Sequence, residues 1–524
     1  MEPARPSLIE TNLSWVFLTP DRAYKLLRPV ELPFVDHRDR QARIDAVRTE
    51  FEVNRSFSPD VYLDLVDLHG ADDDVEDRMI VMRRLDDADA LTERRTPQDL
   101  DAALRSVARR IAGIHASLEA LDGDDAAPAS IEAVTANWED NLRVIERHGD
   151  TVIPTTEVEQ AAQLFRNYLA GREALFEQRV AEGWIRCGHG DLRCEHVFVE
   201  GNDVQLLDAL AFSGDRYRVA DVLADIAFLA MDLDRLHGPE ASVALMQYWG
   251  EFTNEHHASS LAHFLVAYRA HVRTKVALLR FESGDALAAG EAREYHRLAL
   301  RHLEHARPRL VLVGGGPGTG KSTVAEALAR RIGAMWLRAD ELRKDLAGIG
   351  HEDHAFAPPE EGIYSDEMTT RVHRELARRA QLLLSRGESV VLDATWKSDE
   401  HRRLLRETGN EWFAEVDELH CQAPAAIAKE RIARRMSMVH NPSDASPELV
   451  DYIEGHFDDW PEARPIDTNQ PIAESLKEAV DAVTGRPSNT SHQHERFFLD
   501  VPAVKRLTGI WLLHEGLAPI ATDP

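Results

Sequence analysis

The sequence predicts a chain of mixed class, with an α+β domain of two lobes over residues 1–300 and then an α/β domain built as a doubly wound parallel sheet. The first observation is a short apolar run, a glycine-rich loop and a helix-forming stretch, in that order, over residues 310–332. The second is that later apolar runs end on an aspartate, as buried parallel strands do where ligands bind. The third is that strand patterns dominate residues 1–90, whereas long helical patterns dominate residues 91–300.

Length and composition are those of a globular protein with several domains. The chain has 524 residues, of which 44% are apolar and 29% charged, with a mean hydropathy of −0.36, so about three units of ordinary domain size are expected. No apolar run approaches the ~20 residues that a membrane span requires, and the first residues lack the basic and then apolar order of a signal peptide. Cys187, Cys194 and Cys421 are too scattered for a disulfide framework. We therefore expect a cytoplasmic protein with no membrane partner.

The net charge of −30 constrains the partners. Acidic runs such as residues 72–77 are in the first place solvated surface. A field of this sign nevertheless opposes the long-range capture of a polyanion. The charge therefore argues against nucleic acid as the substrate and favours a small molecule, and it carries no information on the oligomeric state.

Residues 1–90 are predicted to form a small lobe of strands around one helix. The strand patterns and the helical pattern fall at residues 12–19, 23–27, 62–68 and 79–84 and at residues 36–54. Lys25 lies in the second strand, and Glu50 and Glu52 lie near the end of the helix. A lone lysine in a strand is most often a surface residue, so interest in Lys25 depends on motifs farther along the chain.

Residues 91–300 are predicted to form a helical lobe interrupted by a pair of short strands. The helical patterns fall at residues 100–121, 133–147, 157–183, 261–279 and 286–305. Before the last two of them, residues 186–199 lead into the strand pair, whose second strand ends in Asp208. Pro308 stops the last helical pattern, so a domain boundary is expected at residues 300–308.

The unit at residues 310–332 carries the most specific chemical signal. Its loop satisfies G-x-x-x-x-G-K-[ST] in full, and the predicted contacts come from Gly315, Gly316, Pro317, Gly318, Thr319, Gly320, Lys321, Ser322 and Thr323. Such glycines let successive backbone N–H groups point at phosphate oxygens, and the helix N-terminus adds its partial positive charge. Lys321 is expected to reach the β- and γ-phosphates and the Ser322 hydroxyl to ligate Mg²⁺. A glycine-rich turn that merely precedes a lysine is the alternative, but the order of elements favours a site for ATP and Mg²⁺.

A second strand is predicted after the loop, over residues 335–340, and it ends in Asp340. The carboxyl ends of parallel strands form the edge where ligands bind in open α/β sheets. Arg343 follows three residues later. A helix cap by Asp340 with an arginine in the first turn is the alternative interpretation, and the two can hold together.

Two further stretches supply candidate ligands. Residues 389–395 form an apolar run closed by Asp393, as expected of a buried parallel strand. A later helix carries Arg431, Arg434 and Arg435, whose spacings of three and four place Arg431 on one face with each of the other two. This face is either a binding surface or a solvated basic one.

Several of these motifs resemble a known family. His189-Gly190-Asp191, followed by the strand that ends in Asp208, resembles the catalytic centre of the aminoglycoside phosphotransferase and protein-kinase-like fold. With Lys25 upstream, the chain resembles a two-part family in which such a domain is fused to a P-loop kinase, of the kind described as an AAA-family ATPase or predicted kinase. The resemblance covers most of the chain, from near residue 8 to residue 485.

The resemblance implies roles in the first domain. Asp191 would accept the proton of the substrate hydroxyl, because this step needs a carboxylate beside the attacking oxygen. Asp208 would hold Mg²⁺. Lys25 would contact phosphates and pair with a helix carboxylate, with Glu50 preferred to Glu52.

Two departures from the family pattern bear on activity. His196 stands five residues after Asp191, where the fold usually has an asparagine metal ligand, and imidazole is a poor ligand for Mg²⁺. Residues 18–22 contain no glycine, so the phosphate-covering loop of protein kinases is altered or missing. The first domain either handles the metal differently, with His196 as a candidate ligand, or has lost phosphotransfer. His189 is expected to brace the catalytic loop and not to act as a base.

The second domain resembles small P-loop kinases of the gluconate-kinase, zeta-toxin and polynucleotide-kinase type. This resemblance implies that Asp340 orients or deprotonates the acceptor hydroxyl and that Arg343 grips an anionic group of the substrate. The strand that ends in Asp393 resembles a Walker B strand, in which this carboxylate holds Mg²⁺ through Ser322 or water. The arginines of the later helix, Arg431 and Arg435 above all, would form a lid that neutralises the transferring phosphoryl group.

The predicted domains are residues 1–300, with a small lobe over 1–90 and a large helical lobe over 91–300, then 306–485, and then a C-terminal extension over 486–524 without an assigned role. The predicted function is ATP-dependent phosphotransfer to a hydroxyl of a small molecule such as a sugar, an amino sugar or a nucleoside. One open alternative is a polynucleotide 5′-hydroxyl kinase, which the Asp-x-x-Arg motif favours and the charge opposes. The other, motivated by His196, is an inactive first domain that senses a ligand and gates the P-loop ATPase.

Overall fold

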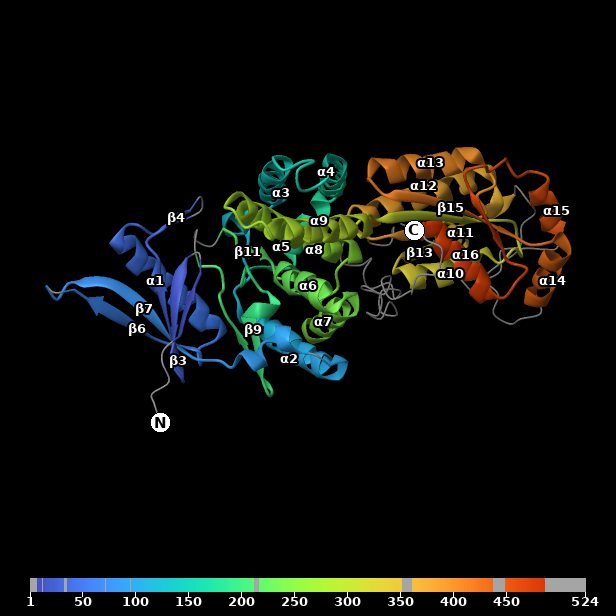
Figure 1. Cartoon of the computed structure of the whole chain (residues 1–524). Helices are drawn as coiled ribbons and strands as arrows, with labels where there is room; N and C mark the ends of the chain where they lie inside the picture. The colour runs from blue at the N-terminus through green and yellow to red at the C-terminus, as the bar shows by residue number, and fades with distance from the viewer. Residues whose placement is uncertain are drawn as a thin grey trace, which may run out of the picture. The chain divides into compact units, whose positions relative to one another are not determined.

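The computed structural model describes residues 7–11, 13–32, 35–70, 72–94, 96–211, 216–350, 361–436 and 448–485, so the predicted extension 486–524 lies outside the described residues. The chain divides into two compact units (Figure 1). The first comprises Met1–Ala162, Phe176–His256 and Ala262–Leu303, and the second comprises Gln163–Leu175, His257–Leu261 and Glu304–Pro524. In the described part of the chain, no helix combines the length and the apolar character needed to cross a bilayer.

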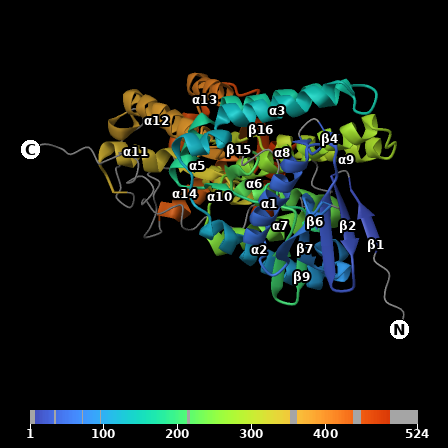
Figure 2. The same ribbon diagram turned by 90° about the vertical axis from the view of Figure 1, so that its left-hand side faces the viewer.

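The first unit begins with an antiparallel sheet of order β1-β2-β3-β7-β6, and Figure 2 shows β1, β2, β6 and β7 side by side. The elements of this lobe are β1 Ser7–Glu10, β2 Ser14–Leu18, β3 Arg22–Leu27, β4 Glu31–Leu32, β5 Val35–Asp36, α1 Arg40–Phe57, β6 Tyr62–His69 and β7 Val75–Arg83. Helix α1 begins at Asp39, whose side chain caps the backbone N–H of Ala42. Its apolar face, with Val47 and Phe51, is buried against the sheet. The predicted small lobe of strands around one helix is confirmed.

Helices dominate the rest of this unit. They are α2 Pro97–Ser117, α3 Ile131–Glu146, α4 Thr155–Ala170, α5 Glu173–Ala181, α6 Leu223–His237, α7 Pro239–Thr253, α8 Ser259–Glu282 and α9 Ala288–His305, of which α4, α5, α8 and α9 also contribute residues to the second unit. The prediction of one helix over residues 157–183 is wrong, because α4 and α5 are separated at Gly171 and Arg172. Glycine is a poor helix former, and the buried Arg172 uses its guanidinium to bond the carbonyl oxygens of Gly171, at 2.7 Å, and Trp412, at 3.0 Å.

Two pairs of short strands carry the predicted catalytic loop of the first unit. They are β8 Ile185–Cys187 with β11 Val219–Asp221, and β9 Val197–Glu200 with β10 Asp203–Leu206. Strand β10 ends before Asp208, which adopts a left-handed backbone conformation with φ of 55°. Asp208 therefore sits on a turn, where a short polar side chain tolerates this conformation, and not in the strand as predicted.

The second unit is an α/β fold with a parallel sheet of order β13-β14-β12-β15-β16. Helices α10 and α16 cover one face, and α12 and α13 cover the other. The elements are β12 Arg309–Gly314, α10 Lys321–Ile332, β13 Met335–Arg338, α11 Ala339–Ala347, α12 Asp366–Leu384, β14 Val390–Asp393, α13 Asp399–Glu411, β15 Glu415–Gln422, α14 Ala425–Met436, α15 Glu448–Glu454, β16 Arg464–Asp467 and α16 Ile472–Thr484. The stretches Leu310–Val313 of β12 and Val390–Leu392 of β14 are apolar, because both faces of these strands are buried. The predicted doubly wound fold is confirmed.

One predicted boundary in this sheet is wrong. Strand β13 ends at Arg338, and Asp340 lies in the first turn of α11 instead of ending a strand. An acidic residue is favourable there because the helix N-terminus carries partial positive charge. The carboxylate still lies at the carboxyl edge of the sheet, because α11 starts directly after β13.

Candidate functional site

The glycine-rich loop joins β12 to α10 and has a backbone that side chains could not adopt. Gly315, Gly318 and Gly320 have positive φ values of 140°, 76° and 84°. A Cβ atom on Gly315 would lie 2.5 Å from the carbonyl oxygen of Cys421, and one on Gly318 would lie 2.4 Å from that of Ala428. Glycine is required at these positions, and the wrapped backbone is the kind that presents N–H groups to an anion.

The loop is held in place by two side chains from distant elements. Thr468, after β16, donates its hydroxyl to the carbonyl oxygen of Thr319 at 2.6 Å. Arg431, on α14, donates to the carbonyl oxygen of Thr468 at 2.7 Å and to that of Gly318 at 3.3 Å. The guanidinium of Arg431 therefore braces the loop in this structure. Arg434 is exposed on the same helix, and the side chain of Arg435 lies outside the described residues.

The carboxyl ends of three neighbouring strands meet beside this loop. In the register of the sheet, Val313 of β12 and Arg338 of β13 both pair with Asp393 of β14. A cavity of about 40 Å³ opens at this edge, and its wall is formed by Lys321, Ala339, Asp340, Arg343, His373, Asp393, Ala394 and Thr395. The structure thus brings together the lysine of the loop and both predicted carboxylates.

Asp393 carries the clearest electrostatic signature in this cavity. Its carboxylate is buried, and its Oδ1 atom has no hydrogen-bond partner. Burial raises the pKa of Asp393, and the carboxylate of Asp340 adds to this effect, while Lys321 and a hydrogen bond from Ser322 oppose it. A cation beside Asp393 would remove this penalty.

The donor set fits Mg²⁺, since a hydroxyl and a carboxylate are hard oxygen ligands. Ser322 and Asp393 supply these two groups, and Oδ1 of Asp393 is the orphaned oxygen. Among the described residues, no group of three or more His, Cys, Asp or Glu side chains is arranged to hold a metal ion. Any Mg²⁺ would therefore need phosphate and water oxygens to complete its coordination.

The turn after β14 is strained and firmly supported. Trp396 is buried and has φ of 56°, a left-handed conformation that is uncommon for a bulky residue. The fully buried Arg402 of α13 donates to the carbonyl oxygens of Trp396 at 2.9 Å, Asp459 at 2.7 Å and Asp458 at 3.4 Å. Strain of this kind persists only where the surroundings enforce it, and it is common next to functional sites.

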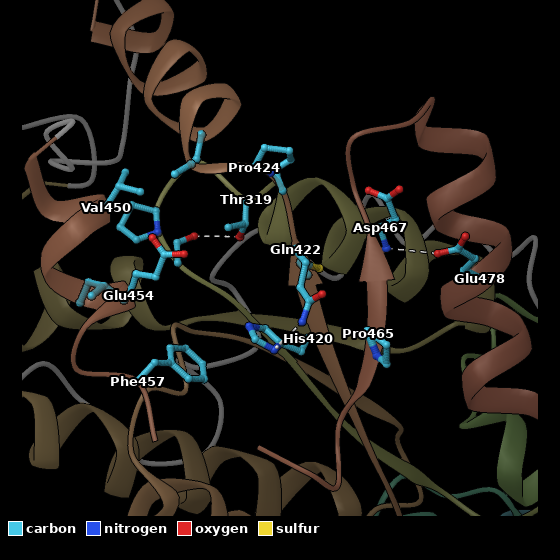
Figure 3. Close-up of a pocket in the computed structure, with 17 residues that line it drawn as sticks. Thr319, His420, Gln422, Pro424, Val450, Glu454, Phe457, Pro465, Asp467 and Glu478 are labelled. Carbon is cyan, nitrogen blue, oxygen red and sulfur yellow. Dashed lines mark hydrogen bonds between the residues drawn. The ribbon is translucent and has the colours of Figure 1, made fainter. Parts of the chain in front are cut away.

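A larger hollow of about 850 Å³ borders the loop at Gly316, Pro317 and Thr319. In Figure 3, the rings of His420 and Phe457 face each other on its wall, with centroids 5.0 Å apart and planes at 10°. Glu454, Asp467 and Glu478 also line it. Its size is that of ligand pockets, and its acidic lining favours a neutral or cationic group over a free phosphate.

The first unit assembles a second polar centre around Lys25. The Lys25 ammonium lies 2.7 Å from Glu50 on α1 and 2.9 Å from Asp208. Burial alone would lower the pKa of Lys25, but the carboxylates of Asp208 and Glu50 outweigh this effect and raise the pKa well above its usual value. Lys25 in turn holds the pKa of Asp208 far below its usual range. Of the two glutamates considered from the sequence, Glu50 makes the pair and Glu52 is exposed.

The turn that carries Asp208 is fastened to α1. Asn54, which is fully buried, accepts a hydrogen bond from the N–H of Ala209 at 2.8 Å, and its amide group donates to the carbonyl oxygen of Glu50 at 3.0 Å. Ser58 exchanges hydrogen bonds with the backbone of Leu206 at 2.8 and 3.0 Å. These contacts fix the distance between the Lys25–Glu50 pair and Asp208.

Asp191 lies in a closed network of its own loop. Its carboxylate accepts hydrogen bonds from Arg193 at 3.1 to 3.3 Å. Burial would raise the pKa of Asp191, but the charges of Arg193 and His196 and the hydrogen bond from Arg193 together outweigh burial, and the pKa is lowered. His196 donates from Nδ1 to the carbonyl oxygen of Asp191 at 2.8 Å, and its Nε2 atom faces Arg193 at 3.2 Å. In this arrangement His196 supports the loop, and its second nitrogen is already engaged.

His189 connects the same loop to neighbouring segments of the chain. Its Nε2 atom lies 3.0 Å from the carbonyl oxygen of Leu207, and its backbone N–H donates to Asp225 at 2.6 Å. The N–H of Gly190 donates to the other oxygen of Asp225 at 2.9 Å. Burial lowers the pKa of His189 to about 4, so the ring is neutral near pH 7.

Sequence reasoning missed three side chains that border these centres. Arg193 pairs with Asp191, Asn54 fastens the turn, and His373 lines the small cavity. Arg193 could have been found from its place two residues after Asp191. The other two lie within amphipathic helices, Asn54 near the end of α1 and His373 in the middle of α12, where polar residues give no local sign of function.

Comparisons with known proteins cover both units. Residues 310–459 match the family model for an AAA domain. The uncharacterized protein Rv2004c of Mycobacterium tuberculosis is 33% identical over 471 residues, which span 90% of this chain and 94% of that protein. The shikimate kinase of Nitratidesulfovibrio vulgaris is 30% identical over 144 residues, or 27% of this chain and 74% of that enzyme. A solved structure, the choline/ethanolamine kinase family protein from Mesorhizobium loti, covers 58% of this chain and 92% of its own with 14% identity and a TM-score of 0.37.

Proposed function

The chain belongs to the same protein family as Rv2004c of Mycobacterium tuberculosis, and we propose that it transfers the terminal phosphoryl group of ATP to a hydroxyl of a small molecule at the edge of its parallel sheet. It is an ATP-dependent phosphotransferase with a P-loop domain. The observation that carries the proposal is the shared cavity of Lys321, Asp340, Arg343 and Asp393 beside the glycine-rich loop. Similarity to an enzyme named shikimate kinase supports a small acceptor.

Each group has a role that follows from its chemistry. The loop N–H groups and the N-terminus of α10 would hold the β- and γ-phosphates, and the Lys321 ammonium would bridge them. The acceptor hydroxyl would bond to the γ-phosphorus as the bond to the bridging oxygen breaks. Asp340 would take the hydroxyl proton, and Arg343 would hold the acceptor. Catalysis is then mainly positioning and charge stabilisation.

Mg²⁺ is the expected cation of this site. Ser322 and Asp393 would hold it, and it would supply neutralisation of charge on the phosphate oxygens. The buried Asp393 carboxylate, with its raised pKa, gains most from such a cation. For Arg431 we propose a role in maintaining the conformation of the phosphate loop, since its guanidinium donates to the carbonyl oxygens of Gly318 in the loop and of Thr468, which bonds to the loop. A part for Arg435 in a lid stays a prediction.

For the first unit we propose a second phosphotransfer site with Asp191 as the base, Lys25 and Glu50 at the phosphates and Asp208 at the metal. The Lys25–Glu50 and Lys25–Asp208 pairs support it. His196 is left out of this metal site, because both of its ring nitrogens have partners. Residues 1–300 and 306–485 remain our proposed domain limits, with the extension 486–524 unassigned.

A second candidate function is favoured by one observation. Arg193 occupies the carboxylate of Asp191 and faces His196, so the first unit could bind a ligand and gate the P-loop site without transferring phosphate. If the first unit does transfer phosphate, a nucleotide phosphate would draw the Arg193 guanidinium away from the Asp191 carboxylate, which could then accept a proton. The polynucleotide alternative has no such support, and the net charge of −30 opposes it.

The test is ATP turnover by the full chain with a panel of sugars, amino sugars, polyols and nucleosides. Lys321→Ala and Asp340→Asn should each lower acceptor-dependent turnover at least about 100-fold. Asp191→Asn should lower turnover only if the first unit transfers phosphate. Turnover that survives Lys321→Ala unchanged would overturn the proposal for the P-loop site.

A further inference from the structure

His373 is a buried residue of the small cavity whose second nitrogen has no partner. It lies on α12, with only 5% of the residue exposed. Its Nδ1 atom lies 2.8 Å from the carbonyl oxygen of Thr369, one helical turn earlier, so this nitrogen carries the hydrogen. The Nε2 atom is then an acceptor, and it is buried without a hydrogen-bond partner. An unsatisfied acceptor in a cavity wall is costly, and a ligand group that donates to it would remove the cost.

The ring is held in one orientation. His401 of α13 stacks on it with centroids 3.9 Å apart and planes at 5°, and Trp396 meets its edge at 5.1 Å and 64°. Burial lowers the pKa of His373 to about 3, so the ring is neutral near pH 7. The ring that carries the unpartnered Nε2 atom is therefore uncharged and held in one orientation.

Arg343 contributes an unmet group of the opposite kind to the same cavity. Its guanidinium donates to the carbonyl oxygen of Ile363 at 2.9 Å and to the hydroxyl of Thr369 at 3.2 Å. Its Nε atom is buried and has no acceptor. The wall thus offers one acceptor on His373 and one donor on Arg343, next to the carboxylate of Asp340.

A hydroxyl is a small uncharged group that can donate to one partner and accept from another. A carbonyl only accepts, and an ammonium group only donates. The cavity of about 40 Å³ has room for a few heavy atoms, since one water needs roughly 10–15 Å³ on the same measure. It can therefore enclose the reacting hydroxyl and one neighbouring group, and little else.

We propose that His373 and Arg343 form hydrogen bonds with a second hydroxyl of the acceptor, on the carbon next to the one that carries the reacting hydroxyl. The acceptor is then a small polyol or sugar with adjacent hydroxyls. This inference rests on the proposed function of the P-loop site. It also separates the acceptor classes. In a polynucleotide the carbon next to the 5′-hydroxyl carries a ring ether oxygen, which cannot donate to His373 and would leave Nε2 unsatisfied.

The test uses matched alcohols with the full chain and γ-labelled ATP. Glycerol, erythritol and xylitol are each compared with the diol that keeps both terminal hydroxyls and lacks the inner ones: propane-1,3-diol, butane-1,4-diol and pentane-1,5-diol. A 5′-hydroxyl oligonucleotide is the remaining acceptor. We expect at least one polyol to exceed its diol in kcat/KM by about 10-fold or more, because a buried polar site rejects an analogue that lacks the hydroxyl.

Variants of His373 test whether this residue causes the preference for polyols over diols. His373→Phe keeps the stacked ring and removes the acceptor, so the preference should fall to about threefold or less, mainly through a higher KM for the polyol. His373→Gln keeps an acceptor oxygen and should restore part of it. His456→Phe is the matched control, since the exposed His456, two residues after the end of α15, makes the same Nδ1 contact with the carbonyl oxygen four residues earlier, at 2.7 Å.

The outcomes are distinct. Equal use of polyols and diols by the wild-type chain, use of the oligonucleotide in preference to every polyol, or a full preference in His373→Phe would each overturn the inference. If ATP turnover still depends on Lys321 in those cases, the proposed phosphotransferase site stands. Turnover that does not depend on Lys321 removes the proposed site as well.

Discussion

At the scale of single residues, the Lys25 ammonium shows how the first unit stabilises a buried charge. It is mostly buried and touches two carboxylates, Glu50 and Asp208. Removing one partner leaves a desolvated charge with less compensation, which costs more than the pair itself contributes. The arrangement therefore keeps a cation and an anion side by side at the position where phosphate and metal are proposed to bind.

Glu50→Gln tests this pair. We expect a loss of about 1–3 kcal/mol in the free energy of unfolding, because the ammonium keeps Asp208 as its remaining partner. Affinity for a non-hydrolysable ATP analogue at the first unit should fall as well. Urea unfolding and equilibrium dialysis measure the two effects. Glu52→Gln, two residues away on the exposed side of α1, is the control. Equal effects of the two substitutions would contradict the role of the pair.

Gly318→Ala tests the glycine-rich loop. Gly318 and Gly348 both have left-handed backbones, with φ of 76° and 68°, but a Cβ atom on Gly348 would meet nothing within 4 Å. Gly348→Ala should therefore cost only the backbone strain, about 1–2 kcal/mol. Gly318→Ala adds a collision with the carbonyl oxygen of Ala428 and should also raise the KM for ATP about 10-fold or more. Similar KM values for the two variants would refute this account of the loop.

Single residues differ in how well they could be predicted. The loop from Gly315 to Ser322 was predictable because its chemistry depends on local spacing alone. Glu50 could be narrowed to two candidates by helix position, and the exposed face of α1 decided between them. His373 could not be found, since its proposed role depends on a cavity formed with Asp340 and Arg343 from a different helix.

At the scale of elements, the packing of two helices of the first unit buries a titratable side chain, that of His271. His271 of α8 is fully buried and packs against Trp138 of α3, with ring centroids 4.7 Å apart. Burial lowers the pKa of His271 to about 3, and nearby cationic groups contribute in the same direction. The folded helix pair therefore accepts this ring only in its neutral form.

This gives a prediction for acid stability with a defined sign. Between the unfolded pKa of about 6.5 and the folded pKa of about 3, only the unfolded chain binds the proton on His271. The free energy of unfolding should therefore fall as the pH drops below 6.5, by up to about 1.4 kcal/mol per pH unit from this residue. His271→Phe should show a shallower fall in urea titrations at pH 7, 6 and 5. Parallel pH profiles for variant and wild type would rule the effect out.

Elements were predicted best where the pattern was long and periodic. The errors have local causes: Gly171 divides a helix that apolar spacing alone would continue, and Asp340 starts a helix where an acidic residue after apolar ones resembled a strand end. Helix α7 and strand β16 were not predicted, because a helix that is apolar on most sides and a short edge strand lack a clear periodicity.

At the scale of the whole molecule, the chain carries two polar centres, one in each compact unit. The division into two successive folds was predictable, because each fold has its own order of strands and helices. The acceptor was not, since fold does not determine substrate. What the sequence left open is how many nucleotides one chain binds.

Binding stoichiometry decides between the two proposals for the first unit. If both units bind nucleotide, equilibrium dialysis of a non-hydrolysable ATP analogue should give two sites per wild-type chain. Lys321→Ala and Lys25→Met should each leave one, because each removes the ammonium that is proposed to contact the phosphates in its own unit. A single site that disappears with Lys321→Ala would instead favour a first unit that senses another ligand and gates the P-loop site.

The buried guanidinium of Arg402 has a mechanical consequence. It donates hydrogen bonds to the carbonyl oxygens of Trp396, Asp458 and Asp459. It therefore connects two turns that are some 60 residues apart in the chain. Neither turn can swing away without stranding a charge in a dry interior. We therefore expect the wall of the small cavity and the segment that carries Phe457 to move together and not independently.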